Sequence, residues 1–165
     1  MTLRYSDAEE RDVEALSRLR TAAAARLTEL YGKGHWSTPI GEAAVRRGFA
    51  HARVVVAKDG NEIVGTMRLA TKKPWAIDSK HFTHVDRALY LTDMAVDPSR
   101  QRMGVGRGLL EVAITLARAW PAEAIRLDAY DAPAGAGPFY ATCGYREVGR
   151  GAYRGVPLIY FEKLM

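Results

Sequence analysis

The sequence has a single cysteine, Cys143, among its 165 residues. One thiol cannot form an internal disulfide, and no cysteine or histidine spacing of the zinc type is present, so we expect a reducing compartment and no bound metal. No apolar run approaches the length that spans a bilayer, so we expect no membrane partner. The N-terminal stretch, MTLRYSDAEERDVEALSRLR, is charged from its start and lacks the apolar segment of a signal peptide. These absences predict a soluble, cytoplasmic protein.

The sequence also lacks a large excess of positive charge. Its net charge is only +5, and this excess is scattered, without any run rich in lysine or arginine. A nucleic-acid-binding domain usually carries a basic stripe or a recognisable motif, so we expect no nucleic-acid partner. Three arginines do lie close together, Arg100, Arg102 and Arg107, beside a run of glycines. Arginines in that setting favour a small phosphorylated ligand at least as strongly as a duplex.

The spacing of the apolar residues predicts helices and strands in alternation. We expect helices over residues 8–31, 41–49, 104–119 and 135–143, and strands over residues 2–5, 53–57, 62–70, 89–96, 124–130, 145–149 and 158–164. Ser6 and Glu9 have the spacing of a capping box at the start of the first helix. The Asp59–Gly60 pair favours a hairpin between the second and third strands. Residues 72–87, of mixed polarity, predict a long loop.

Three alternating glycines, Gly104, Gly106 and Gly108, open the predicted helix over residues 104–119. Each glycine costs a helix roughly 1 kcal/mol relative to alanine, so something must come close to this backbone. The free N–H groups of a helix start carry partial positive charge, and glycine lacks the Cβ atom that would hold a phosphate away. The run therefore predicts a phosphate-binding loop, with a tight turn that holds no ligand as the alternative.

Two common nucleotide-binding motifs do not fit this run. A Walker A loop requires Gly-x-x-x-x-Gly-Lys-Ser/Thr, and no such lysine is present. A dinucleotide fingerprint requires Gly-x-Gly-x-x-Gly, but Gly108 comes one position early and Leu109 stands where the last glycine belongs. The predicted loop therefore binds a different phosphate compound.

The run Gln101-x-x-Gly104-x-Gly106 resembles the acetyl-CoA pyrophosphate loop of the GNAT superfamily of N-acetyltransferases. It follows an apolar strand and opens an amphipathic helix. Further along, the segment PFYATCGY, residues 138–145, resembles the family's Tyr-x-x-x-Gly-Phe element, with Tyr145 in the aromatic place. The resemblance implies an α/β (α+β) fold: residues 1–165 form a single GNAT-like N-acetyltransferase domain, with a mixed, mostly antiparallel sheet of six to seven strands and helices on both faces.

The resemblance also implies acetyl-CoA as cosubstrate and a set of coenzyme contacts. These are Met94, Ala95, Val96, Gln101, Arg102, Met103, Gly104, Val105, Gly106, Arg107 and Tyr140. In the family, the strand before the loop bulges, and its main chain pairs with the pantetheine arm, with the N–H at Met94 directed at the thioester carbonyl. Residues 94–96 would equally suit an ordinary buried strand end.

Tyr140 matches the family's general acid, which protonates the departing thiolate. A phenol suits that role because it is protonated at neutral pH. A tyrosine on a short helix also serves as a core residue, and that alternative stays open. Pro133 departs from the pattern, because many relatives have an asparagine there that contacts the coenzyme.

The general base is open between several groups. Asp128 lies twelve positions before Tyr140, where some relatives that acetylate amino termini carry a catalytic carboxylate, and a solvated residue on the outer strand face is the alternative. By strict alternation Tyr90 and Thr92 share a face with Met94, where they could hold a chain of water molecules, while Asp93 points the other way.

The variable loops are expected to recognise the acceptor, with Tyr31, Trp36 and Trp75 as substrate-binding residues. The resemblance implies a primary amine as acceptor, and the long 72–87 segment favours a small molecule, since it would crowd a groove for an extended chain. A protein N-terminal amine and a non-catalytic acyl-CoA-binding regulatory domain are the alternatives. We expect a monomer or a homodimer.

Overall fold

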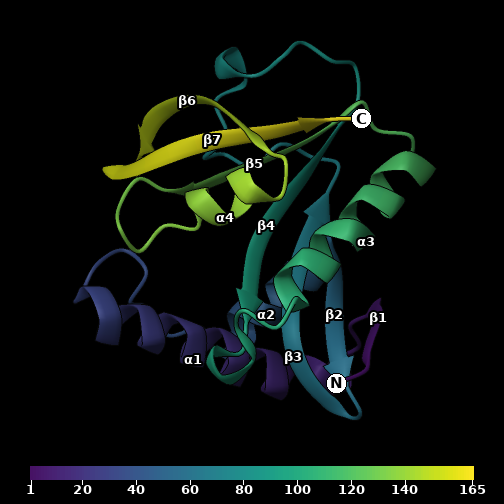
Figure 1. Ribbon diagram of the computed structural model, residues 1–165, viewed down its shortest axis with the longest axis vertical. Coiled ribbons are helices and arrows are strands. Elements are labelled where there is room, and N and C mark those ends of the chain that lie inside the picture. The colour runs from purple at the N-terminus through teal and green to yellow at the C-terminus, as the bar shows by residue number, and fades with distance from the viewer. The chain divides into compact units, whose positions relative to one another are not determined.

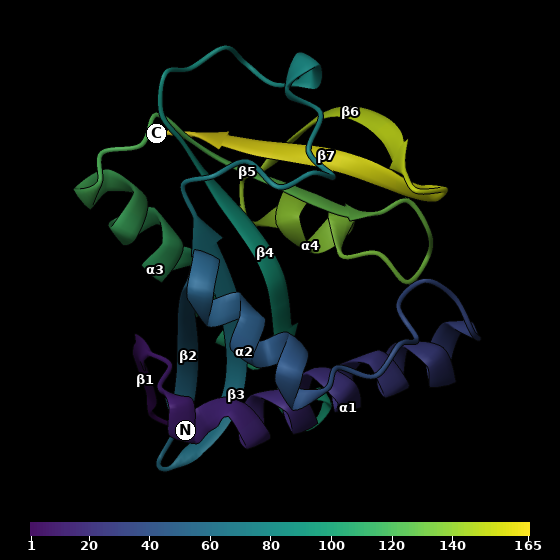
Figure 2. The same ribbon diagram turned by 180° about the vertical axis from the view of Figure 1, so that it is seen from behind.

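The computed structural model describes all residues, Met1–Met165, and has one hydrogen-bonded sheet in the order β1-β2-β3-β4-β5-β7-β6 (Figures 1 and 2). The strands are β1 (Leu3–Asp7), β2 (Arg53–Asp59), β3 (Glu62–Ala70), β4 (Ala88–Val96), β5 (Ala124–Tyr130), β6 (Arg146–Tyr153) and β7 (Val156–Leu164). The helices are α1 (Val13–Tyr31), α2 (Glu42–His51), α3 (Val105–Ala119) and α4 (Gly137–Thr142), with short 3-10 turns η1 (Glu10–Asp12), η2 (Ser79–His81) and η3 (Pro98–Arg100). The β4–β5 pair is parallel, whereas the β1–β2, β2–β3, β5–β7 and β6–β7 pairs are antiparallel. The predicted mixed, mostly antiparallel sheet is confirmed.

The chain folds as two compact units, which are described separately. The first unit contains Met1–Leu69 and Asp93–Val112, and the second contains Ala70–Thr92 and Ala113–Met165. Both β4 and α3 therefore contribute residues to each unit. No helix is long and apolar enough to cross a membrane.

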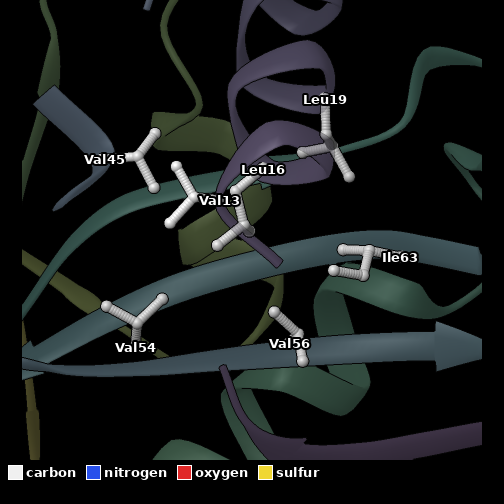
Figure 3. Close-up of a cluster of buried hydrophobic side chains, with 7 residues drawn as sticks. All are labelled: Val13, Leu16, Leu19, Val45, Val54, Val56 and Ile63. Carbon is white, nitrogen blue, oxygen red and sulfur yellow. The ribbon is translucent and has the colours of Figure 1, made fainter. Parts of the chain in front are cut away.

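The core of the first unit lies between α1, α2 and the β2–β3 hairpin, as Figure 3 shows. The seven side chains that form it are Val13, Leu16, Leu19, Val45, Val54, Val56 and Ile63. Intervals of three residues place the α1 members on one helix face, and alternation places Val54 and Val56 on one face of β2. The first turns of α3 pack on the opposite face of the hairpin, where Val105 and Leu109 approach Gly65.

The core of the second unit is built on the β5–β7–β6 part of the sheet. One face is covered by the 72–87 segment, and the buried residues there are Ile77, Phe82, Ala88, Tyr90, Leu158 and Tyr160. Helix α4 packs against β7 through Tyr140, whose ring centroid lies 6.2 Å from that of Phe161. Because Tyr160 and Phe161 are neighbours on β7, they point to opposite faces of the sheet.

A buried carboxylate fastens the 72–87 segment to β7. Glu162 is 1% exposed and accepts hydrogen bonds from the Thr83 backbone N–H (3.1 Å) and the Arg146 guanidinium (2.7 Å), and also from the Thr83 hydroxyl. Burial alone would raise the pKa of Glu162, but the bonds from Thr83 and Arg146 outweigh burial and lower it. The long loop predicted at 72–87 is therefore anchored, and it contains the short turn η2.

Two local predictions were wrong. The capping-box bond joins the Glu9 N–H to the Asp12 carboxylate (2.8 Å), whereas Ser6 lies within β1 opposite Val56. The last two strands are also longer than predicted, because β6 continues to Tyr153 and meets β7 through a tight turn. The glycines of β6 resemble a loop in sequence, and only pairing with β7 makes this stretch a strand.

Candidate active site

The loop between β4 and α3 exposes its backbone where the phosphate-binding run was predicted. Gln101, Arg102, Met103 and Gly104 are all exposed, while the Val105 side chain is 1% exposed and anchors the first turn of α3. Gly104 has a φ of +87°, and no atom lies within 4 Å of the place where its Cβ would stand. A ligand can thus come close to this backbone.

The electrostatics at the start of α3 favour an anion. The first N–H groups of a helix have no partner within the helix, and they carry the positive end of its dipole. No acidic residue lies in the first turn of α3. The exposed side chains of Arg102 and Arg107 add two positive charges beside Gly104. The predicted coenzyme-binding segment 101–107 thus combines a helix start with two exposed arginines, a combination that suits a pyrophosphate.

Two members of the predicted run serve the fold instead. Arg100 donates to Asp59 (2.8 Å) and Glu62 (3.0 Å), so its charge is used to hold η3 against the β2–β3 hairpin. Gly108 faces the Tyr5 hydroxyl, and a Cβ at this position would collide with it. The prediction that all three arginines and all three glycines surround a phosphate was therefore too broad.

The end of β4 holds the residues that the resemblance assigned to the pantetheine arm. Met94, Ala95 and Val96 are all half-buried, and Ala95 packs against the core of the first unit. Asp93, directly before them, has a φ of +51°. A left-handed residue interrupts the alternation of a strand, so the expected common face of Thr92 and Met94 does not follow from their spacing.

Tyr140 lies on α4 of the second unit and is 6% exposed. Burial raises the pKa of this phenol above its ordinary value of 10, and the charges of Tyr145, Asp128 and Cys143 raise it further. Tyr140 therefore keeps its proton at neutral pH. That property is the one required of a proton donor.

Tyr145, the aromatic residue of the same element, contacts Tyr140 edge-on, with 5.9 Å between ring centroids. Its ring is 3% exposed, and its backbone N–H donates to the Tyr140 carbonyl at 3.0 Å. The Tyr145 hydroxyl is buried without a hydrogen-bond partner in the protein. A buried hydroxyl in that state is destabilising, and the sequence pattern alone gave no indication of it.

Asp128 is half-buried on β5, opposite Tyr160 on β7. Its neighbour Leu127 is opposite Phe161, the residue that lies near the ring of Tyr140, so Asp128 shares the sheet face of Tyr160 instead. The Asp128 charge nevertheless raises the pKa of both Tyr140 and Tyr160, so the carboxylate lies within electrostatic reach of each phenol. Asp128 is accordingly half-buried and not fully solvated.

The two other candidates on β4 differ from each other. Thr92 is half-buried at the end of the second unit's part of the strand. Tyr90 is buried in the core, and its hydroxyl accepts a hydrogen bond from Arg126 at 3.2 Å. Phe82, which lies in the 72–87 segment, is likewise a core residue.

The predicted acceptor-binding aromatics differ in exposure. Tyr31 ends α1 and is 49% exposed, and Trp75 in the second unit is 83% exposed. Trp36 is half-buried, lies against Gly34 and donates from Nε1 to the Gly32 carbonyl at 3.0 Å. Trp36 therefore stabilises its own loop, whereas the rings of Tyr31 and Trp75 are available for contact. His81 of the same unit as Trp75 is half-buried and stacks on Tyr160.

Sequence reasoning missed a charged cluster beside the end of β4. Arg20 on α1 and Arg68 on β3 both pair with Asp93. Two indications were available in the sequence. One arginine lies inside the mostly apolar run of β3, and another comes four residues after the buried Leu16.

Comparison with known proteins agrees with this geometry. The sequence profile of the acetyltransferase (GNAT) family matches residues 19–145, well over half of the chain. The chain belongs to the GNAT family. It is thus an acetyltransferase, and acetyl-CoA is the acyl donor of its family. No curated protein sequence matches the chain.

Solved structures of GNAT proteins share the fold over the full length of the chain. The GCN5-related N-acetyltransferase (aminotransferase, class-II) of Rhodopseudomonas palustris is 19% identical, with 100% of this chain and 97% of that chain covered and a TM-score of 0.76. The PaiA N-acetyltransferase of Thermoplasma acidophilum, in complex with coenzyme A, is 12% identical, with 100% of both chains covered and a TM-score of 0.76. The ribosomal-protein-S18-alanine N-acetyltransferase of Escherichia coli is 18% identical, with 99% and 94% covered and a TM-score of 0.71. At these identities the similarity establishes the fold.

Proposed function

We propose that this GNAT acetyltransferase moves an acetyl group from acetyl-CoA to a primary amine of a small molecule, with residues 1–165 working as one N-acetyltransferase domain. The observation that carries the proposal is the open, left-handed backbone at Gly104, at the positive end of α3 and beside Arg102 and Arg107. These residues fit a pyrophosphate in charge and in access.

The reaction exchanges a thioester bond for an amide bond. The neutral amine nitrogen gives its electron pair to the carbonyl carbon, and the carbon–sulfur bond breaks with its electron pair on sulfur. The nitrogen loses one proton and the sulfur gains one, so the products are an amide and the free thiol. The protein must supply a donor for the developing oxyanion, an acid for the sulfur and a route for the amine's proton.

Each of these tasks has a candidate group in the chain. The backbone of Met94–Val96 is the donor segment that the family resemblance indicates. Tyr140 is the general acid, and its burial supports this role because the phenol stays protonated at neutral pH. Asp128, directly or with water held by Thr92, accepts the proton of the amine. A phenolate in the surroundings of Tyr140 would be poorly solvated, so the proton that the amine loses must return to Tyr140 to complete the turnover.

A small acceptor is favoured by the way the 72–87 segment is built. Ile77 and Phe82 anchor it in the core, and Thr83 ties it to Glu162, so the segment is fixed rather than free to make room for an extended chain. Trp75 and Tyr31 expose aromatic rings that suit contact with an apolar or cationic small molecule.

A screen of amines tests the proposal. The purified protein is mixed with acetyl-CoA and a panel of polyamines, amino sugars, amino acids and aromatic amines, together with peptides that have free N-termini. Release of the CoA thiol is followed with a chromogenic thiol reagent. Cys143 is the one protein thiol and adds at most one equivalent, so turnover is read from the excess above that amount.

The possible results separate the three candidate functions. Thiol release with a small amine is the expected result, whereas release with peptides alone would indicate a protein N-terminal acetyltransferase. Tight binding of acetyl-CoA in calorimetry without any release would indicate a non-catalytic acyl-CoA-binding domain. If NAD raised the melting temperature as much as CoA, the assignment of the 101–107 loop to CoA would be wrong.

A further inference from the structure

Asp93 has a backbone conformation that is unusual for its place in the chain. Three non-glycine residues have positive φ values, Asp93 (+51°), Arg102 (+62°) and Arg154 (+51°). Arg102 and Arg154 lie in turns, where such values are common, but Asp93 lies inside β4. Aspartate tolerates this region better than most side chains, but inside a strand such a residue persists only where the surrounding structure holds it. The contacts of Asp93 must therefore explain why the strand adopts it.

Two arginines from two different elements hold the Asp93 carboxylate. Arg20 of α1 forms an ion pair from Nη2 to one oxygen at 3.0 Å, and Arg68 of β3 donates a hydrogen bond from Nη1 to the other at 2.5 Å. The three side chains are 17%, 27% and 29% exposed for Arg20, Arg68 and Asp93. Ion pairs that are partly withdrawn from water are stronger and less screened than exposed ones. We call this cluster the Asp93 clamp.

The Asp93 clamp lies beside a small cavity of the first unit. The cavity beside it is lined by the clamp residues and by Leu16, Val45, Val54 and Thr66, and its volume of about 10 Å³ has room for one water molecule. At Gly48 of α2, a Cβ would lie 3.2 Å from the Arg68 Nε, so the helix comes close to the guanidinium at this glycine. Both contacts, from Gly48 and from the cavity wall, thus involve groups of the first unit.

The backbone of Asp93 sets the direction of the next peptide group. That peptide carries the N–H of Met94, and the segment Met94–Val96 follows directly in β4. Hydrogen bonds weaken steeply with misalignment, and a donor that stabilises an oxyanion acts only if it is held in place before the reaction. A small rotation at Asp93 would therefore change what this segment can bind.

We propose that Asp93 is a positioning residue, whose clamp by Arg20 and Arg68 fixes the left-handed turn that orients the Met94–Val96 backbone for the acyl end of acetyl-CoA. This inference rests on the proposed function, and it concerns the acyl end only. The pyrophosphate is assigned to the 101–107 loop, so the two ends of acetyl-CoA are held by different segments.

The test is Asp93→Asn, because asparagine keeps the size of the side chain and also tolerates positive φ, while the charge that attracts both arginines is lost. Asp7→Asn is the matched control, since Asp7 also pairs with an arginine, Arg53, at 2.7 Å, but on the edge strand β1. For each protein, the dissociation constants of acetyl-CoA and of CoA are measured by calorimetry, and kcat is measured with an amine from the screen.

We expect Asp93→Asn to weaken acetyl-CoA binding about fivefold, the size of one neutral hydrogen bond, while CoA binding changes by less than about twofold. We expect kcat to fall by about tenfold or more, because the oxyanion donor is no longer fixed. Asp7→Asn should leave all three quantities unchanged. A purely structural role predicts a lower melting temperature with the acetyl-CoA to CoA affinity ratio and kcat intact, and that result would overturn the proposal.

Arg68→Lys keeps the test decisive if Asp93→Asn does not fold. Lysine retains the charge and loses the fixed geometry of the guanidinium, so a smaller selective loss of acetyl-CoA affinity is expected. Unchanged affinities and kcat in Arg68→Lys would also overturn the proposal. A wild-type protein that binds neither acetyl-CoA nor CoA would instead contradict the proposed function, so the two failures are distinguishable.

Discussion

Replacing Gly104 with alanine separates the binding role of the loop from its structural role. Gly104 has a φ of +87°, and nothing lies within 4 Å of the place of its Cβ. The added methyl group therefore meets no protein atom, and the folded state loses only the ease with which glycine adopts this backbone. A bound phosphate would meet the methyl group directly, because the loop is exposed at this point.

The two costs have different sizes. An alanine in the left-handed conformation destabilises the folded state by about 1–2 kcal/mol. The lower conformational freedom of alanine in the unfolded chain offsets about 0.4–1 kcal/mol of this, so the free energy of unfolding should fall by about 1 kcal/mol. Displacing a phosphate from one backbone N–H costs about 1.5–3 kcal/mol, the value for a hydrogen bond to a charged group. The dissociation constant of CoA should therefore rise by roughly 10- to 150-fold.

Gly60→Ala is the matched control for this measurement. Gly60 lies in the β2–β3 turn with a φ of +62° and has the same open surroundings. Both variants should lose similar stability in thermal melts, and only Gly104→Ala should lose CoA affinity in calorimetric titration. If both variants, or neither, bound CoA more weakly than the wild type, the reasoning about the loop would be refuted.

Four further predictions follow from single side chains. Tyr140→Phe should lower kcat about tenfold or more and leave the acetyl-CoA dissociation constant unchanged in calorimetry; an unchanged kcat would remove Tyr140 from the chemistry. Asp128→Asn should lower kcat/KM at neutral pH and recover part of it at high pH, where more of the amine is neutral; wild-type kcat/KM at pH 7 would exclude Asp128 as the base. Tyr145→Phe removes a hydroxyl that lacks a protein partner. In denaturant unfolding, the free energy of unfolding should therefore stay the same or rise by up to about 1 kcal/mol, and a fall of more than about 1 kcal/mol would contradict the unpaired state. Glu162→Gln should lower the free energy of unfolding by about 1–2 kcal/mol at neutral pH. Because the pKa of Glu162 is lowered in the fold, the difference in melting temperature from the wild type should shrink as the pH falls below about 4.5 and the wild-type carboxylate takes up its proton. A constant difference down to pH 3 would contradict this.

Local chemistry in the sequence was enough for the order of the elements, and it also supplied the prediction of a coenzyme loop. The apolar intervals of α1, α3 and β2 produce their buried faces, because a helix or strand can bury only one regular set of positions. Gly104 and Gly106 before a helix indicated a phosphate because the cause, an open helix start, lies within the same short segment. Family membership followed from the same stretch and is confirmed by the match over residues 19–145.

The tertiary structure alone decided which of these groups serve the fold and which remain for a ligand. Arg100 forms ion pairs with Asp59 and Glu62 of the hairpin, and the Tyr5 hydroxyl of β1 lies close against Gly108. Partners distant in the sequence therefore occupy two residues of the apparent phosphate-binding motif. The left-handed turn at Asp93 depends likewise on arginines 73 and 25 positions earlier in the chain, as the numbering of Arg20 and Arg68 shows. A sequence pattern records which groups are present along the chain, but ion pairs and close approaches depend on which segments the fold brings together.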